Sequence, residues 1–252
     1  MTPTTNGDSY LRLENAVPVP TAASRITGGH LKTVITHGAM MCLHGDLGLG
    51  KTFAVRLTLR DLAPDTTLAF QFPLDHPLGA IKQDLAHALH LEPGPALDRR
   101  IRQALAQRPY VLYLDEAQGL SPHALEYIRN LWQDDTLHLA VVFVGALDCR
   151  QRLRRRAALA SRILIWQRYR PLHPDEVCTV MPQFHPLWRH VSPQDLLWLD
   201  DAACRGNFRD WAKLTFLLQA DILNDGARLD DGFSRARARR VLEDFDPSDL
   251  HK

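Results

Sequence analysis

A glycine-rich segment at residues 44–52, HGDLGLGKT, constrains this 252-residue chain more than any other feature. The apolar run just before it, residues 39–43, has the character of a buried strand, and apolar residues recur at helical spacing over residues 53–62. A glycine loop between a strand and a helix N-terminus directs backbone N–H groups at an anion. The spacing G-x-x-x-x-G-K-[ST] therefore predicts a phosphate-binding loop (P-loop). Its residues are Gly45, Asp46, Leu47, Gly48, Leu49, Gly50, Lys51 and Thr52.

The last two residues of this loop indicate which phosphates it would hold. Lys51 would reach the β- and γ-phosphates of ATP, and the hydroxyl of Thr52 would ligate Mg²⁺. We therefore expect ATP and Mg²⁺ as cofactors. The alternative is a flexible glycine turn that ends in an incidental Lys-Thr pair. The strand before the loop and the helix after it favour the phosphate-binding interpretation.

Two acidic residues follow a second apolar run, residues 110–114. If this run is a strand of a parallel sheet, Asp115 and Glu116 emerge at its carboxyl edge, beside the phosphate loop. This is a Walker B arrangement, in which Asp115 would hold Mg²⁺ through its water shell. Glu116 would orient and polarise the water that attacks the γ-phosphate. Two acids after a strand are often only a turn signal, but the preceding P-loop favours the catalytic interpretation.

Composition and charge limit the possible partners. The chain is 45% hydrophobic and its net charge is +1, so overall charge attracts neither nucleic acid nor membrane, and any such binding needs a local patch. The four cysteines have no C-x-x-C pairing, which indicates a reducing environment. No apolar run is long enough to cross a bilayer, and the N-terminus lacks the pattern of a secretory signal. We expect a cytoplasmic protein without a membrane partner.

The order of predicted elements indicates an α/β fold with a parallel sheet flanked by helices and a small helical lid. Residues 1–20 are polar and contain prolines, so we expect an arm that is ordered only where it docks. Residues 21–170 alternate helices and strands, beginning with a helix that Gly28 and Gly29 would interrupt or cap. Residues 171–225 form the lid, and 226–252 form an arginine-rich helix with an acidic end. That last helix is either a docking segment or a surface helix.

Arginines and one alanine stand out around the fourth and fifth predicted strands. Ala146 occupies the sheet-edge position where a polar sensor of the γ-phosphate is expected, so hydrolysis could be slow or conditional unless Asp148 or Gln118 substitutes. Arg162 precedes the last strand and could enter a neighbouring subunit's nucleotide site as an arginine finger. Two basic clusters are either solvated faces or contacts to DNA phosphates or to a neighbouring subunit. They are Arg150, Arg152, Arg154, Arg155 and Arg156, and Arg99, Arg100 and Arg102.

Taken together, these motifs resemble the AAA+ ATPases. More narrowly, the chain is similar to the transposition-regulator group typified by TnsC, TniB and MuB, and to the related ExeA-like ATPases. The resemblance covers about residues 20–220 and rests on the P-loop, Asp-Glu-Ala-Gln at 115–118, Ser161-Arg162 and Gly-Asn-Phe-Arg at 206–209. It implies that Arg209 is a sensor II arginine that touches bound nucleotide. Ala146 departs from the family pattern.

The resemblance implies an ATPase that assembles as a ring or helical filament on duplex DNA and recruits and activates a transposase there. The expected partners are therefore duplex DNA, a transposase or another recombination protein, and further copies of the chain. The expected catalytic residues are Lys51, Glu116 and Arg162. Two alternatives share the same site: a helicase loader or replication initiator, and a nucleotide-driven assembly switch without DNA. A small-molecule P-loop kinase would leave Arg162 and Arg209 without a role.

Overall fold

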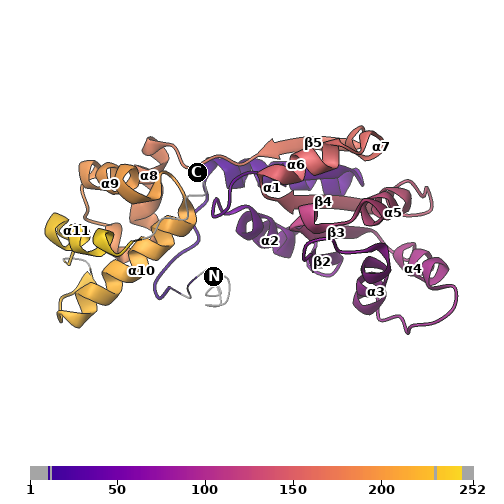
Figure 1. The fold of residues 1–252 in the computed structure, drawn as a ribbon, viewed down its shortest axis with the longest axis horizontal. Helices are drawn as coiled ribbons and strands as arrows, with labels where there is room; N and C mark the ends of the chain where they lie inside the picture. The colour runs from indigo at the N-terminus through magenta and orange to yellow at the C-terminus, as the bar shows by residue number, and fades with distance from the viewer. Residues whose placement is uncertain (1–10, 12, 230–231, 246–252) are drawn as a thin grey trace. The chain divides into compact units, whose positions relative to one another are not determined.

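The computed structural model describes residue 11 and residues 13–229 and 232–245. These residues form two compact units (Figure 1). The α/β unit comprises residues 26–46 and 51–169, and the helical unit comprises the described residues up to Arg25, residues 47–50 and those from Arg170 onward. The middle of the P-loop therefore belongs to the helical unit, while its two ends belong to the α/β unit.

The α/β unit is built on a five-stranded sheet in the order β2-β3-β4-β1-β5 (Figure 1). All neighbouring strands run parallel, as the sequence pattern predicts. β1, β3 and β4 are buried along their whole length, because each lies between two other strands and has helices on both faces. The strands are β1 Met40–His44, β2 Thr67–Gln71, β3 Tyr110–Asp115, β4 Leu139–Gly145 and β5 Ile163–Arg168.

Helices cover both faces of this sheet. From β1 the chain crosses to β2 at one edge of the sheet. It then moves back across the sheet, strand by strand, through β3 and β4 to β5 at the other edge. Right-handed crossovers therefore place α2 on one face and α3 to α7 on the opposite face. Ile81, Ile101, Ile128 and Leu153 from α3, α4, α5 and α6 pack in one core with Met40 and Cys42 of β1. The helices are α1 Ala22–Thr36, α2 Lys51–Leu62, α3 Leu78–Ala88, α4 Leu97–Leu105, α5 Pro122–Trp132, α6 Leu147–Arg154 and α7 Ala157–Ala160, with the 3₁₀ turn η1 at Ala117–Gly119.

The expected break in the first helix is wrong. α1 runs without interruption through Gly28 and Gly29, and neither glycine has another atom near the place of a side chain. Glycine in a helix costs about 1 kcal/mol relative to alanine. The burial of Leu31 and Val34 offsets this loss, since both side chains are completely enclosed.

The helical unit packs around two tryptophans. The rings of Trp188 and Trp211 meet edge to face, with 5.2 Å between their centroids. The indole N–H of Trp188 donates to Thr215 Oγ1, and that of Trp211 donates to Asp200 Oδ1. Both polar ends are thus satisfied inside the core. The elements are α8 Pro174–Phe184, η2 Pro186–Trp188, α9 Pro193–Leu199, η3 Asp200–Cys204, α10 Phe208–Asn224 and α11 Arg235–Glu243.

Part of the N-terminal arm docks on this unit. Leu13 is buried in its core, and the backbone N–H of Val17 donates to the carbonyl of Phe184 at the end of α8. His185 Nε2 lies 2.9 Å from the carbonyl oxygen of Glu14. Residues 13–17 of the predicted arm thus contact the helical unit, while residues 1–10 and 12 lie outside the described part.

The arginine-rich helix α11 packs on the helical unit itself. Arg237 pairs with Asp221 and Asp225, at 3.0 and 2.6 Å, and Arg240 lies 3.3 Å from Asp221. Ala238 faces the core and is fully buried. Three of the arginines of α11 thus pair with acids of the same unit, and both interpretations of this helix stay open.

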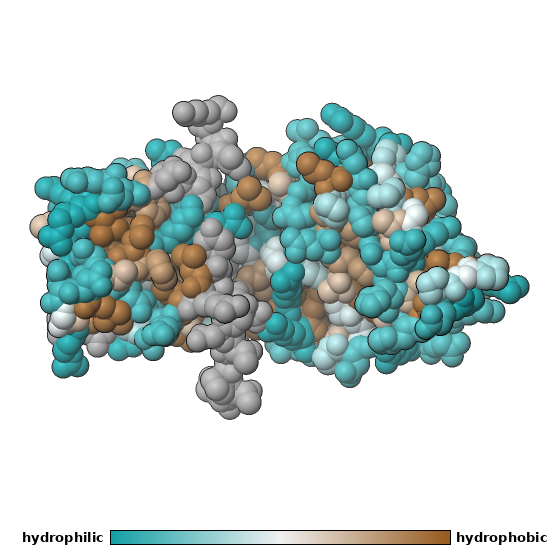
Figure 2. Space-filling view, turned by 60° about the horizontal axis from the view of Figure 1, so that its bottom comes forward, coloured by the Kyte–Doolittle hydropathy of each residue, from teal (hydrophilic) through white to brown (hydrophobic). Residues whose placement is uncertain are grey.

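The surface of the helical unit carries apolar side chains. Figure 2 shows brown, apolar surface on this unit, which lies at the left of the view. On α10, the exposed large hydrophobic residues are Phe216, Leu217 and Leu223. In the described part of the chain, no helix is long and apolar enough to cross a membrane.

Candidate nucleotide site

The P-loop has a backbone that only glycine tolerates at two positions. Gly45 and Gly48 have φ angles of 154° and 81°. A Cβ at Gly45 would lie 2.6 Å from the carbonyl oxygen of Tyr169, and one at Gly48 would lie 2.8 Å from Cβ of Arg209. Both positions thus combine a conformation that L side chains rarely adopt with close neighbours. The loop leads directly into α2, which begins at Lys51.

Lys51 is buried within the curve of this loop. Its ammonium donates to the carbonyl oxygens of Gly45 and Asp46, at 2.9 and 2.7 Å. These contacts hold the positive charge beside the backbone that would surround a phosphate. The prediction for Lys51 is thus consistent with the geometry of the loop.

The two predicted magnesium ligands meet at the carboxyl edge of the sheet. The hydroxyl of Thr52 donates to Oδ1 of Asp115 at 3.3 Å, although the two residues come from different elements. Asp115 is almost completely buried. A hydroxyl and a carboxylate are oxygen ligands of the kind that Mg²⁺ prefers, and Mg²⁺ needs only one or two of them from the protein. The residues present therefore fit Mg²⁺ bound with a nucleotide.

Two side chains that the sequence reasoning missed also contact Asp115. The hydroxyl of Tyr113 donates to Oδ2 at 2.8 Å, and the guanidinium of Arg56 lies 3.8 Å from the same oxygen. Burial, followed by the nearby charge of Asp115, raises the pKa of Tyr113 far above its usual value, so this hydroxyl stays a donor. Both residues could have been found by spacing. Tyr113 lies two strand positions before Asp115, and Arg56 lies one helical turn after Thr52.

Glu116, the predicted base, lies in a sharp turn at the end of β3. Its φ and ψ angles of 51° and 41° place it in the left-handed region, which is uncommon for residues other than glycine. Its carboxylate accepts a hydrogen bond from Nε2 of Gln118. Oε1 of Gln118 in turn accepts from the backbone N–H of Ala146 at 3.3 Å. Of the two candidates to supply a polar group beside Ala146, Gln118 is thus the one whose side chain reaches it.

The histidine that precedes the loop is surrounded by positive charge. His44 ends β1 and is buried, and its Nδ1 has no hydrogen-bond partner among the described residues. Burial is the main cause that lowers the pKa of His44 to about 4, and Arg150, Arg168, Lys51 and Arg154 lower it further. His44 is therefore neutral at pH 7, and the charge of this region comes from lysine and arginine.

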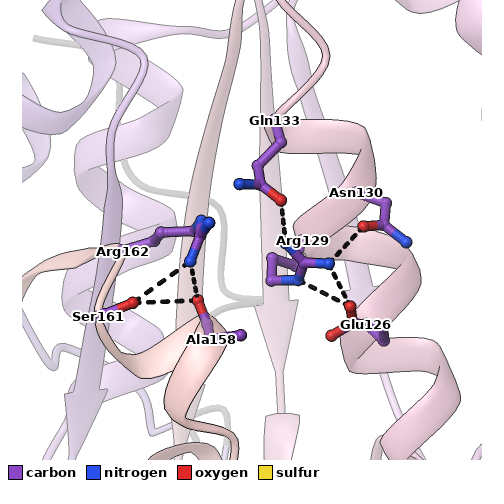
Figure 3. Close-up of polar contacts among 7 residues, drawn as sticks. All are labelled: Glu126, Arg129, Asn130, Gln133, Ala158, Ser161 and Arg162. Carbon is purple, nitrogen blue, oxygen red and sulfur yellow. Dashed lines mark hydrogen bonds and ion pairs between the residues drawn. The ribbon is translucent and has the colours of Figure 1, made fainter.

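Arg162 lies immediately before the edge strand β5 (Figure 3). In the single chain its guanidinium donates to the carbonyl of Ala158 and contacts Ser161 Oγ at 3.3 Å. On the neighbouring helix α5, the guanidinium of Arg129 is bonded to Glu126. The hydrogen bond from Arg129 is the main cause that lowers the pKa of Glu126, and Arg162 adds to the effect from a distance. Arg162 is thus a partly exposed cation in the turn that precedes the outer strand β5.

The predicted basic clusters divide into paired and exposed arginines. Arg102 is held by Asp98 and Asp134, at 3.1 and 2.7 Å. Arg152 lies 3.3 Å from Asp148 and donates to the carbonyl of Gln118. Asp148 lies one helical turn before Arg152, which is the spacing at which side chains of a helix meet. The other members, Arg99, Arg100, Arg150, Arg154, Arg155 and Arg156, are exposed or half-buried.

Arg209 lies at the start of α10. Asn207 caps this helix by accepting a hydrogen bond from the backbone N–H of Arg209 at 3.0 Å. The amide of Asn207 also donates to the carbonyl of Leu47, and the backbone N–H of Arg209 donates to the carbonyl of Gly48. These bonds fix the start of α10 against the middle of the P-loop.

The parallel sheet, the glycine loop with Lys51 and the Thr52–Asp115 pair define a P-loop nucleotide-binding domain. Residues 35–153 match the family model described as an AAA domain. The fold is that of the AAA+ ATPases.

A curated relative and two solved structures are similar to the chain. General secretion pathway protein A of Aeromonas hydrophila is 30% identical over 155 residues, which are 56% of this chain and 28% of that protein. The chain therefore spans less than a third of that relative. Cdc6p from Pyrobaculum aerophilum has a TM-score of 0.67 at 19% identity, covering 85% of this chain and 66% of that one. ORC1 of Aeropyrum pernix, in complex with DNA, has a TM-score of 0.62 at 17% identity, covering 91% and 66%.

Proposed function

We propose that this protein binds and hydrolyses ATP, and that ATP drives its assembly on duplex DNA. The observation that carries the first part is the Thr52–Asp115 pair beside the P-loop, with Glu116 next in the chain. The proposed assembly on DNA rests on the exposed arginines at the end of α6 and just after it, and on the similarity to ORC1, which was solved in complex with DNA.

The residues divide the chemistry of ATP hydrolysis among them. The loop N–H groups and Lys51 bind the phosphates, and Thr52 and Asp115 would hold Mg²⁺, which would supply charge neutralisation at the phosphates. Glu116 accepts the proton of the attacking water as its oxygen bonds to the γ-phosphorus and the bond to ADP breaks. Arg209 contacts the nucleotide of its own subunit.

Arg162 would act on the nucleotide of a neighbouring copy. Its place before the edge strand β5 lets a second chain approach it, and ATP then stabilises the contact between subunits. Such contacts repeat head to tail, so they form a ring or an open helix and not a two-fold dimer. Each subunit would contribute one basic strip to the DNA contact. The strip is made either of Arg150 and Arg154 on α6 with Arg155 and Arg156 just after it, or of Arg99 and Arg100 on α4. Arg102 and Arg152 are left out because of their ion pairs.

We further propose that the assembly selects a target site for a transposase, as the resemblance to the transposition regulators suggests. The similarity to Cdc6p and ORC1 favours a second candidate, a replication-initiator or helicase-loader type of ATPase. A stable complex with a replicative helicase would favour this second candidate, and stimulation of strand transfer by a transposase would favour the first.

A salt-titrated DNA-binding assay tests the core of the proposal. The protein is incubated with duplex DNA and ATP or a non-hydrolysable analogue, and assembly is followed by electron microscopy. Replacing Arg150, Arg154, Arg155 and Arg156 by glutamine should weaken DNA binding and make it less dependent on salt, while the affinity for ATP persists. The double variant of Arg99 and Arg100 tests the other strip. A protein that stays monomeric with ATP and DNA would contradict the proposal. Equal assembly without DNA would favour the alternative of a nucleotide-driven assembly switch that does not use DNA.

A further inference from the structure

Gln118 holds the side chain of Glu116 through an amide whose orientation is fixed by both of its neighbours. Its Nε2 donates to the carboxylate of Glu116, and its Oε1 accepts from the backbone N–H of Ala146. Of the two polar atoms of the amide, only the nitrogen can donate to the carboxylate and only the oxygen can accept from the N–H, so the reverse orientation would lose both bonds. Gln118 thus links the end of β3 to the end of β4.

The end of β4 is shaped to admit this amide. Gly145 is fully enclosed, and a Cβ there would collide with Oε1 of Gln118 and lie 2.7 Å from Cβ of Cys149. Ala146 follows with a side chain too small and apolar to bond to Glu116. Because neither residue 145 nor residue 146 fills the space or competes for the carboxylate, Gln118 takes the position between the two strand ends.

Arg152 fixes Gln118 from the other side. Its Nη1 donates to the backbone carbonyl of Gln118 at 2.7 Å, and its Nε lies 3.3 Å from Asp148 on the same helix. Gln118 lies in the 3₁₀ turn η1, which packs against α6. One arginine of α6 therefore braces the turn that carries Gln118, and the bond to a carbonyl is charge-assisted.

We propose that Gln118 is a positioning residue for the catalytic carboxylate of Glu116, and that Arg152 acts on hydrolysis through Gln118. This inference rests on the proposed ATPase function. The amide keeps one carboxylate oxygen of Glu116 bonded and leaves the other oxygen to accept the proton of the attacking water. Gln118 thus orients the carboxylate of Glu116, which the apolar side chain of Ala146 cannot do.

Steady-state hydrolysis separates this role from nucleotide binding. Gln118→Ala should lower kcat at least about ten-fold and leave KM for ATP within about two-fold, since the phosphate contacts are intact. Arg152→Ala should lower kcat less than Gln118→Ala does, and Arg152→Lys should keep part of the kcat that Arg152→Ala loses. In the Gln118→Ala background, Arg152→Ala should cause no further fall in kcat. The control is Gln151→Ala, an exposed glutamine on α6 beside Arg152, which should retain the original kcat.

A second readout needs no nucleotide. Urea unfolding of Gln118→Ala, Glu116→Ala and the double variant should give non-additive losses, because each single change breaks the same hydrogen bond. Three results would each overturn the inference. They are additive losses of stability in this cycle, an unchanged kcat in Gln118→Ala, and a further loss of kcat when Arg152→Ala is added to Gln118→Ala. Failure of the original protein to bind or hydrolyse ATP would instead overturn the proposed function, and the unfolding cycle would still decide whether Gln118 holds Glu116.

Discussion

The hydroxyl of Thr52 donates to Asp115 at 3.3 Å, although 63 positions of sequence separate the two residues. Thr52 comes from the first turn of α2 and Asp115 from the end of β3, so this pair depends on the sheet that brings the two elements together. The loop that is predicted to bind phosphate and the strand that is predicted to bind the cation thus come together only in the folded chain.

Replacing Lys51 by alanine should abolish ATP binding. The ammonium is the main cation within the loop, and its two carbonyl partners would be left without a donor. Calorimetric titration with ATP should show at least a hundred-fold loss of affinity, while the circular dichroism spectrum stays the same. Unchanged affinity would remove Lys51 from the site.

Replacing Glu116 by glutamine should preserve ATP binding and abolish turnover. The amide is close to isosteric but cannot accept the proton of the attacking water. We expect kcat to fall at least about a hundred-fold, with the nucleotide trapped as ATP in whichever assembly it favours. Normal steady-state turnover in this variant would show that another group activates the water.

Replacing Arg162 by alanine should abolish ATP-dependent assembly and leave ATP affinity of the single chain unchanged. The guanidinium contacts Ala158 and Ser161 at the exposed end of α7, so its removal disturbs little of the fold. Mass photometry with and without ATP would measure the loss. Arg129→Ala is the matched control, because that arginine lies beside Arg162 but is bonded to Glu126 (Figure 3). Equal loss in both variants would point to overall charge and not to Arg162.

The strand-loop-helix pattern and the acids after β3 were predictable because each motif is local and its spacing carries the chemistry. Parallel pairing then brought Asp115 beside Thr52, as expected. Contacts between elements were harder to predict. The bond from Arg152 to Gln118 joins α6 to η1 over 34 positions of sequence, and no local spacing indicates it. The pairing of Arg102 with Asp134, 32 positions away, escaped prediction for the same reason.

Replacing Asp200 by alanine should destabilise the helical unit. Its Oδ1 accepts from the backbone N–H of Gly206 at 2.7 Å and from the indole of Trp211 at 2.9 Å, and all three groups are inside the core. Two buried donors would lose their partner, for a loss of about 2–4 kcal/mol in the free energy of unfolding. Asp200→Asn is the control, since its carbonyl can still accept, and urea denaturation should show a smaller loss. Equal losses would mean that the charge matters and not the acceptor.

Acid should weaken the fold through His44. Its pKa is about 4 in the folded chain, and the usual value of 6.5 applies after unfolding, so the unfolded chain binds more protons between these values. The free energy of unfolding should therefore be constant above pH 6.5 and fall by about 2 kcal/mol from pH 7 to pH 5 on this account. In His44→Gln this part of the pH dependence should disappear. A variant whose stability falls with acid as steeply as the original would contradict the assignment.

The ion pairs of α11 make one tryptophan an optical reporter. The guanidinium groups of Arg235 and Arg239 lie over the ring of Trp198, 5.5 and 6.0 Å from its centroid, and Arg235 is also bonded to Asp195. These contacts are screened by salt, as are contacts between arginine and DNA phosphates. A rise in ionic strength would therefore act on two equilibria at once, the proposed binding of DNA and the packing of α11. The fluorescence contributed by Trp198, taken as the difference between the original protein and Trp198→Phe, would follow the packing of α11 alone.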